Sequence, residues 1–121
     1  MDFGLEVKKE ARFVDHPRGA QVELVLYVVE EDSYVQPILC PPAFTRFDAK
    51  MLALGHLDQW HQRLDSGDYT FDDEDWLVDS ELCIDGHLLS YGFGTRDVAR
   101  GRAVFSAHTW LYDFAELVKN M

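Results

Sequence analysis

A single two-residue connection constrains the fold of this chain most strongly. Asp85-Gly86 is the preferred sequence of a type I′ hairpin turn, in which both central residues adopt positive φ. It separates an alternating segment at 76–84 from a second one at 88–93. Because a connection this short joins antiparallel neighbours, the chain is predicted to contain an antiparallel sheet.

The first third of the chain has the same pattern. Residues 3–14 alternate between apolar and polar side chains, as in a strand with one face in water. A loop at 15–19 contains proline and glycine, and residues 20–30 then become apolar on both faces, which is typical of a central strand. A third strand is predicted at 34–39, where Pro37 favours a position at the edge of the sheet.

Two amphipathic helices are predicted from the helical spacing of apolar residues. The first covers about 46–66, with Thr45 or Asp48 as its N-cap and Gly67 directly after its end. The second begins at about residue 110. The residues expected in the core between helices and sheet are Leu57, Trp60, Leu64, Phe114 and Leu117.

Together these elements predict one α+β domain. Their order is β-β-β-α-β-β-β-α, with a loop at 68–75 and the last strand near 102–108. Over residues 1–121 we expect an antiparallel sheet of about five to six strands that carries both helices on one side. A length of 121 residues suits a single domain of this kind.

The net charge of the chain restricts the ligands it can bind. Eleven Lys and Arg residues stand against 22 Asp and Glu residues, which gives a formal charge of −11. Nucleic acids and anionic membranes attract cationic surfaces, so neither is expected as a direct ligand. A basic protein is the more natural partner, although a high net charge also serves solubility.

The sequence favours a cytoplasmic protein. Its first residues carry neither the basic n-region nor the apolar h-region of a signal peptide, and its longest apolar run is far shorter than a bilayer span. Cys40 and Cys83 are too few and too far apart for a disulfide framework. They are expected to be reduced thiols that are not bonded to each other.

The most informative feature is an acidic segment that contains no lysine or arginine between Leu64 and Thr95. Its carboxylates repel one another, and no local folding requirement explains their accumulation. Aromatic residues stand among them, and aromatic anchors surrounded by charge are typical of binding hot spots. The predicted partner-binding site consists of Asp65, Asp68, Tyr69, Asp72, Asp73, Glu74, Asp75, Trp76, Asp79 and Glu81. The alternative is a solubilising loop, with Phe71 and Trp76 in the core.

Signatures of catalysis and of cofactor or metal binding are weak. Gly92-Phe93-Gly94 begins like a dinucleotide fingerprint, but the third glycine position holds Asp97, whose carboxylate would repel a pyrophosphate. Asp58, His61 and Asp65 lie on one flank of the first predicted helix, and they are the candidates for a small enzyme or ligand-binding site. We expect no cofactor and no metal, and we predict that the protein is not an enzyme.

Two segments of the sequence resemble small bacterial toxin-immunity proteins of the WapI-type and related families. They are FDAKMLALGHLDQWHQRLDSGDYTF, with its corner Leu64-Asp65-Ser66-Gly67, and DWLVDSELCIDGHLLSYGF. Members of these families neutralise a toxin made by the same cell, commonly by direct binding, and have no catalytic residues. The resemblance implies an immunity protein that neutralises a toxin by direct binding. The lack of basic residues around the acidic segment fits a toxin domain that is itself basic, such as a nuclease. A second hypothesis, from charge alone, is a phage- or plasmid-encoded inhibitor that imitates DNA and blocks a host defence or DNA-binding protein.

Overall fold

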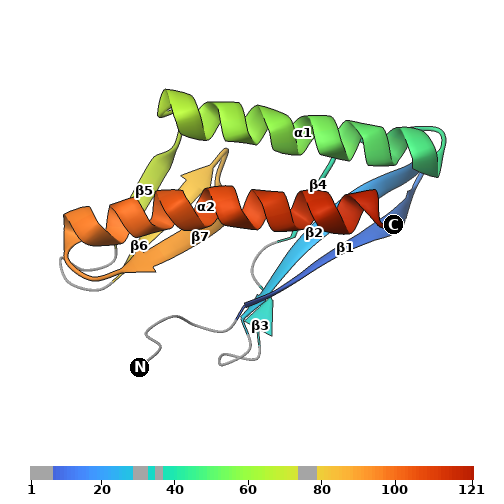
Figure 1. Ribbon diagram of the computed structural model, residues 1–121. Helices are drawn as coiled ribbons and strands as arrows, with labels where there is room; N and C mark the ends of the chain where they lie inside the picture. Colours follow the sequence, from blue (N-terminus) through green and yellow to red (C-terminus); the bar gives the residue numbers. More distant parts are fainter. Residues whose placement is uncertain (1–6, 29–32, 35–36, 74–78) are drawn as a thin grey trace. The chain divides into compact units, whose positions relative to one another are not determined.

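The computed structural model describes residues 7–28, 33–34, 37–73 and 79–121, and it confirms an α+β chain (Figure 1). Its two helices contribute no segment long and apolar enough to cross a membrane among these described residues. The elements in chain order are β1 (Val7–His16), β2 (Gly19–Val28), β3 (Ser33–Tyr34), β4 (Ile38–Leu39), α1 (Arg46–Ser66), β5 (Thr70–Asp73), β6 (Asp79–Ile84), β7 (His87–Phe93) and α2 (Arg96–Lys119).

The strands form two antiparallel sheets, so the prediction of one sheet of five to six strands is not confirmed. In the first sheet β2 is central, with β1 on one edge and β3 and β4 sharing the other. The second sheet has the order β5-β6-β7. The strands of the first sheet precede α1 in the chain and those of the second follow it.

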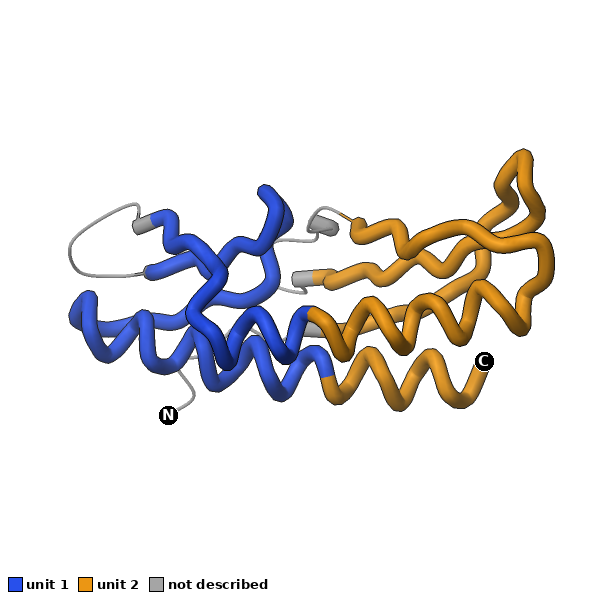
Figure 2. The backbone as a smooth tube through the Cα atoms, turned by 90° about the horizontal axis from the view of Figure 1, so that it is seen from above, with its two compact units in different colours: residues 1–4, 60–111 blue, residues 5–59, 112–121 orange. Residues whose placement is uncertain are grey.

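Two compact units are formed by the described residues (Figure 2). Unit 1 consists of residues 60–111, and unit 2 consists of residues 7–59 and 112–121. Unit 1 therefore contains the second sheet with the end of α1 and the larger part of α2. Unit 2 contains the first sheet with the larger part of α1 and the end of α2. In each unit, both the strands and the helix segments contribute buried apolar side chains.

The predicted core is confirmed at four of its five positions. Leu57, Trp60, Leu64 and Phe114 are all buried. Leu117 is 37% exposed, so its assignment to the core was wrong. The helix turns about 100° per residue, and the buried position on this turn of α2 belongs to Val118 instead.

Helix α1 begins and ends where its sequence predicts. The Asp48 amide donates a hydrogen bond to Thr45 Oγ1 at 3.0 Å, so Thr45 is the N-cap of the two candidates. Gly67 follows the helix with a φ of +76°, a left-handed conformation that favours glycine. The Asp68 amide donates to the Arg63 carbonyl at 2.9 Å, which completes a Schellman ending.

Helix α2 and strand β5 correct two predictions. The strand predicted near 102–108 is part of α2, which is helical from Arg96 and not from about 110. The segment 68–75, predicted as a loop, contains β5. One stripe of side chains explains why this segment is helical. Its alanines favour the helix, because alanine has the highest helix propensity. The spacing of about four residues places the whole stripe on one buried face of the helix. The buried stripe is Ala99, Ala103, Ala107, Leu111, Phe114 and Val118.

The hairpin turn at Asp85-Gly86 is confirmed. Asp85 and Gly86 have φ values of +53° and +78°, which are the positive values that a type I′ turn requires at both central residues. The turn joins β6 to β7, which pair in antiparallel register. It therefore places the acidic residues of β6 directly beside the side chains of β7.

Cys40 and Cys83 are both free thiols. The buried thiol of Cys40 is expected to make the stability of the folded protein depend measurably on pH. Burial raises the pKa of the Cys40 thiol from its ordinary 9.0 to about 12. Because the folded state holds this proton more tightly, the stability it contributes is complete below pH 9.0 and is lost as the pH rises towards about 12. In this range the wild type is expected to lose up to about 1.4 kcal/mol per pH unit relative to Cys40→Ala. Urea unfolding of both proteins at several pH values measures the difference, and parallel stability curves would contradict it.

Candidate functional site

All described residues of the predicted binding site belong to unit 1, but they do not form one cluster. Glu74, Asp75 and Trp76 lie outside the described residues. Asp73 and Asp79 are the last residue of β5 and the first residue of β6. The other predicted residues divide into three groups, which lie on the sheet, at the end of α1 and between α1 and α2.

The first group is a pair of carboxylates on the sheet. Asp72 of β5 lies directly opposite Glu81 of β6 in the register. Both carboxylates help to raise the pKa of the Cys83 thiol, after the larger effect of its burial, which places their negative charges close to this side chain. Like charges directly opposite each other destabilise a pair of strands.

Two aromatic residues of β7 share this side of the sheet. Tyr91 lies opposite Glu81 in the register, and paired residues of an antiparallel ladder point to the same side. The rings of Tyr91 and Phe93 are in edge-to-face contact, with centroids 5.4 Å apart, and both side chains are half-buried. We call Asp72, Glu81, Cys83, Tyr91 and Phe93 the acidic face.

The second group surrounds Arg63 at the end of α1. Its Nε atom donates to Asp68 at 2.9 Å, and a terminal nitrogen donates to Asp85 at 2.6 Å. The hydrogen bond with Asp85 is the largest cause that raises the pKa of Arg63. Asp68 is thus one of two carboxylates that share a single cation, so this group carries less free negative charge than its sequence suggests. Arg63, Asp68 and Asp85 line a pocket of about 330 Å³ together with Gly67, Tyr69, Thr70, Cys83 and Gly86.

Asp65 forms the third group with two histidines. Its carboxylate oxygen lies 3.5 Å from Nε2 of His108 on α2, and Nδ1 of His108 lies 3.0 Å from Nδ1 of His61. Asp65 therefore faces α2 and does not belong to the acidic face. Asp58, the third member of the predicted enzymatic cluster, is exposed on α1. Within the described ranges, no group of three or more His, Cys, Asp or Glu side chains is placed to hold a metal ion.

The contacts of Tyr69 and Phe71 agree in part with the alternative hypothesis, in which Phe71 belongs to the core. Their rings are in edge-to-face contact, with centroids 5.4 Å apart. The Arg100 guanidinium of α2 lies over the Phe71 ring at 4.8 Å from its centroid, a cation–π contact. Phe71 is therefore bound to the helix of its own unit. Tyr91 and Phe93 lie next to the acids, although the sequence pattern did not connect them, and the Tyr91 ring also contacts Trp110 of α2 with centroids 5.5 Å apart.

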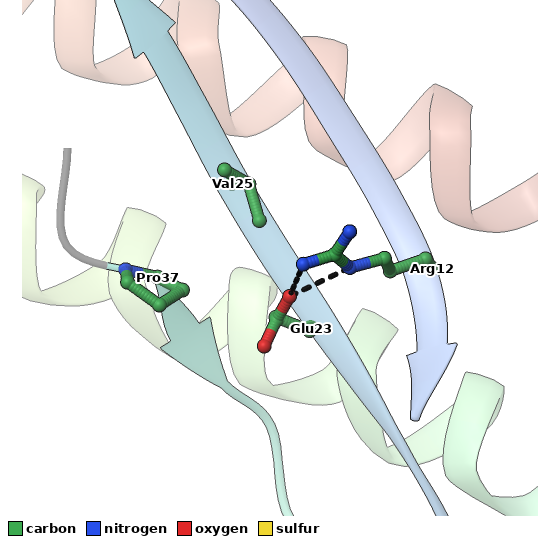
Figure 3. A pocket seen from close by; sticks show the side chains of 4 residues that line it. All are labelled: Arg12, Glu23, Val25 and Pro37. Atoms are coloured by element: carbon green, nitrogen blue, oxygen red, sulfur yellow. Dashed lines mark hydrogen bonds and ion pairs between the residues drawn. The ribbon is translucent and has the colours of Figure 1, made fainter. Parts of the chain in front are cut away.

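A further pocket, of about 220 Å³, lies on the sheet of unit 2 (Figure 3). Arg12, Glu23, Val25 and Pro37 line it. The Arg12 Nε atom donates to Glu23 at 2.7 Å, so that the two charges in this pocket neutralise each other. This pairing leaves the pocket with little charge to offer a ligand.

Comparison of the chain with protein-family models, with curated proteins and with solved structures found no match. The assignment of a function therefore rests on the geometry of the chain itself. Among the three acidic groups, only the acidic face combines opposed carboxylates with adjacent aromatic rings. This combination fits the recognition of a cationic protein surface.

Proposed function

We propose that this protein is a non-enzymatic immunity or inhibitor protein that binds a basic partner protein through the acidic face of unit 1. The opposition of Asp72 and Glu81 on neighbouring strands is the observation that supports the proposal most. Two carboxylates on neighbouring strands concentrate negative charge on this surface, which attracts the cationic side chains of a basic partner. The resemblance to immunity proteins favours a nuclease-like toxin domain as the partner.

The side chains of the acidic face suit two separate stages of such an interaction. The carboxylates at Asp72 and Glu81 attract a basic partner over a distance of about one Debye length, which raises the association rate at low salt. Phe93 offers half-buried aromatic surface beside the carboxylates, whereas the Tyr91 ring is in edge-to-face contact with Trp110 of α2, with centroids 5.5 Å apart. Aromatic residues in such positions govern dissociation, because they bury apolar area once the complex has formed.

Reversal of both opposed charges tests the proposal. Inspection of the neighbouring genes for a basic toxin domain identifies the partner to be tested, and binding of its catalytically inactive form is followed by surface plasmon resonance. Asp72→Lys with Glu81→Lys is expected to slow association about 10- to 100-fold at low salt, because both carboxylates lie at the proposed contact. Circular dichroism checks that the double variant is folded.

Two further variants make this result specific. Glu10→Lys with Asp15→Lys changes the same number of charges on exposed residues of β1 and is expected to slow association much less. Arg63→Ala frees Asp68 and Asp85 from their shared cation and is expected to speed association. Unchanged association of the Asp72/Glu81 variant would place the interface elsewhere. Displacement of a DNA-binding protein from DNA would instead support the inhibitor that imitates DNA.

A further inference from the structure

Unit 2 exposes a group of large apolar side chains at the start of α1. Phe44, directly before the helix, is 85% exposed, and Phe47 in its first turn is 69% exposed. Met51 and Leu52 on the next turn are also exposed. Phe47 and Met51 are four residues apart, so they lie on one stripe of the helix. We call Phe44, Phe47, Met51 and Leu52 the apolar helix face.

Two cationic side chains of the same helix turns contact other elements of unit 2. The Arg46 guanidinium lies over the ring of Phe13 on β1, 5.3 Å from its centroid. The Lys50 ammonium donates to the backbone carbonyl of Lys119 on α2 at 2.7 Å. A helix at the surface of a monomer normally directs charged residues to water and large apolar residues inwards. In the first turns of α1 the buried side chains are the small Ala49 and Ala53, whereas the large apolar side chains are exposed, which is typical of an interface.

Phe44 in particular is not used in the packing of its own helix. Since Thr45 is the N-cap, Phe44 occupies the position from which a hydrophobic staple contacts the residue four places after the cap. That residue is Ala49, which is fully buried, whereas Phe44 is almost fully exposed. The aromatic ring is therefore available to a second molecule.

Gly55 continues the stripe of Phe47 and Met51 by one more turn. A Cβ atom added at Gly55 would have no atom within 4 Å, so no close contact in the described structure requires a glycine there. Glycine inside a helix costs about 0.5–1 kcal/mol relative to alanine. The absence of a side chain would allow another helix to approach α1 closely at this point.

The charges of the neighbouring segments favour a second copy of the chain as the occupant of this face. Although the chain has a net charge of −11, residues 44–55 and 112–121 carry equal numbers of cations and carboxylates. Two copies can therefore approach here with the least repulsion, and a two-fold axis can bring opposite charges together. A basic toxin or an anionic membrane would need a surface with one predominant sign. The charged residues in question are Arg46, Lys50 and Lys119, and Asp48, Asp113 and Glu116.

From these observations we infer that the apolar helix face binds a second copy of this chain and forms a homodimer. The interface is isologous, so that α1 of one protomer packs against α1 of its partner near Gly55. This surface belongs to unit 2 and is separate from the acidic face of unit 1. Dimerisation would present two acidic faces on one assembly.

Analytical ultracentrifugation of the full chain over about a hundredfold range of concentration tests the inference. The wild type is expected to sediment as a dimer. Phe47→Glu with Met51→Glu is expected to raise the dimer dissociation constant at least about 100-fold, because it places carboxylates in the apolar centre of the interface. Phe105→Glu on α2 of unit 1 is the matched control, since Phe105 is 75% exposed and lies outside the proposed interface.

Several outcomes would overturn the homodimer. These are a wild type that remains monomeric at every concentration, and a dimer that persists in the Phe47/Met51 variant. Sedimentation of a monomeric wild type with phosphatidylglycerol vesicles would assign the face to a membrane surface instead. If circular dichroism shows that the double variant is unfolded, Gly55→Leu replaces it, since its added side chain blocks the close approach of the helices. The Asp72/Glu81 variant should remain dimeric, which separates this test from that of the proposed function.

Discussion

Replacement of Trp60 with alanine is expected to lower the free energy of unfolding by about 3–5 kcal/mol, the range for large-to-small changes in protein cores. Trp60 is only 3% exposed, and it packs in unit 1 with its ring centre 6.3 Å from that of His87 on β7. The substitution leaves a cavity between the end of α1 and the sheet. Equilibrium unfolding in urea, followed by circular dichroism, measures the loss.

Gln62→Ala provides the reference for this prediction. Gln62 is exposed on the same helix, so its truncation is expected to change stability by less than about 0.5 kcal/mol. A loss of less than about 1 kcal/mol for Trp60→Ala would show that α1 does not pack against the sheet through this side chain.

Gly92→Ala is the second substitution for which a large loss is expected. A Cβ atom at Gly92 would collide with the backbone carbonyl of Ala99 and lie 2.8 Å from the backbone nitrogen of Ala103. Because both contacts are with the backbone of α2, the helix itself must move away from β7. That movement would also break the hydrogen bond from Ser90 Oγ to the Ala103 carbonyl, which is 2.6 Å long. We expect a loss of about 3 kcal/mol, at the upper end of the usual cost of overpacking.

Gly101→Ala is the matched control for this loss, and it should have the opposite sign. Gly101 lies on the exposed side of α2, where an added Cβ atom would meet no atom within 4 Å. Alanine is therefore expected to stabilise the helix by about 0.5–1 kcal/mol. Thermal unfolding of the two variants beside the wild type measures both effects. Equal behaviour of Gly92→Ala and Gly101→Ala would contradict the close packing of β7 against α2.

The same contact explains why the fragment Gly92-Phe93-Gly94 resembles the start of a dinucleotide fingerprint. In this fold Gly92 has a packing role, because its missing side chain lets α2 approach β7. Gly94 has a φ of +127° and lies in the short connection between these elements. Glycines that serve close packing and tight turns recur in many folds, so two of them are weak evidence for a nucleotide site.

The candidate site could be predicted from the sequence only in part. The acidic composition of the segment is visible in the chain, and the predicted site includes both Asp72 and Glu81, but the chain order does not reveal that they lie opposite each other on neighbouring strands. The chain order does not reveal that Arg63 pairs with Asp68 and Asp85, or that Asp65 faces His108. The contacts with Asp85 and His108 join elements that are separated in the sequence. They depend on strand register and on how the helices pack, which local patterns do not specify.

The sequence by itself determined the elements whose signals are local. The ends of α1 follow from the Thr45 cap and from Gly67, and the β6–β7 turn follows from Asp85-Gly86, because in each case a few neighbouring residues decide the backbone conformation. Tertiary structure decided the division into two sheets, the strand β5 and the full length of α2. A four-residue strand such as β5 is stable only when a partner strand supplies its hydrogen bonds. The alanines of α2 carry little apolar area, so the sequence pattern does not show that they are buried. Their burial depends on β7, which packs against them through Gly92.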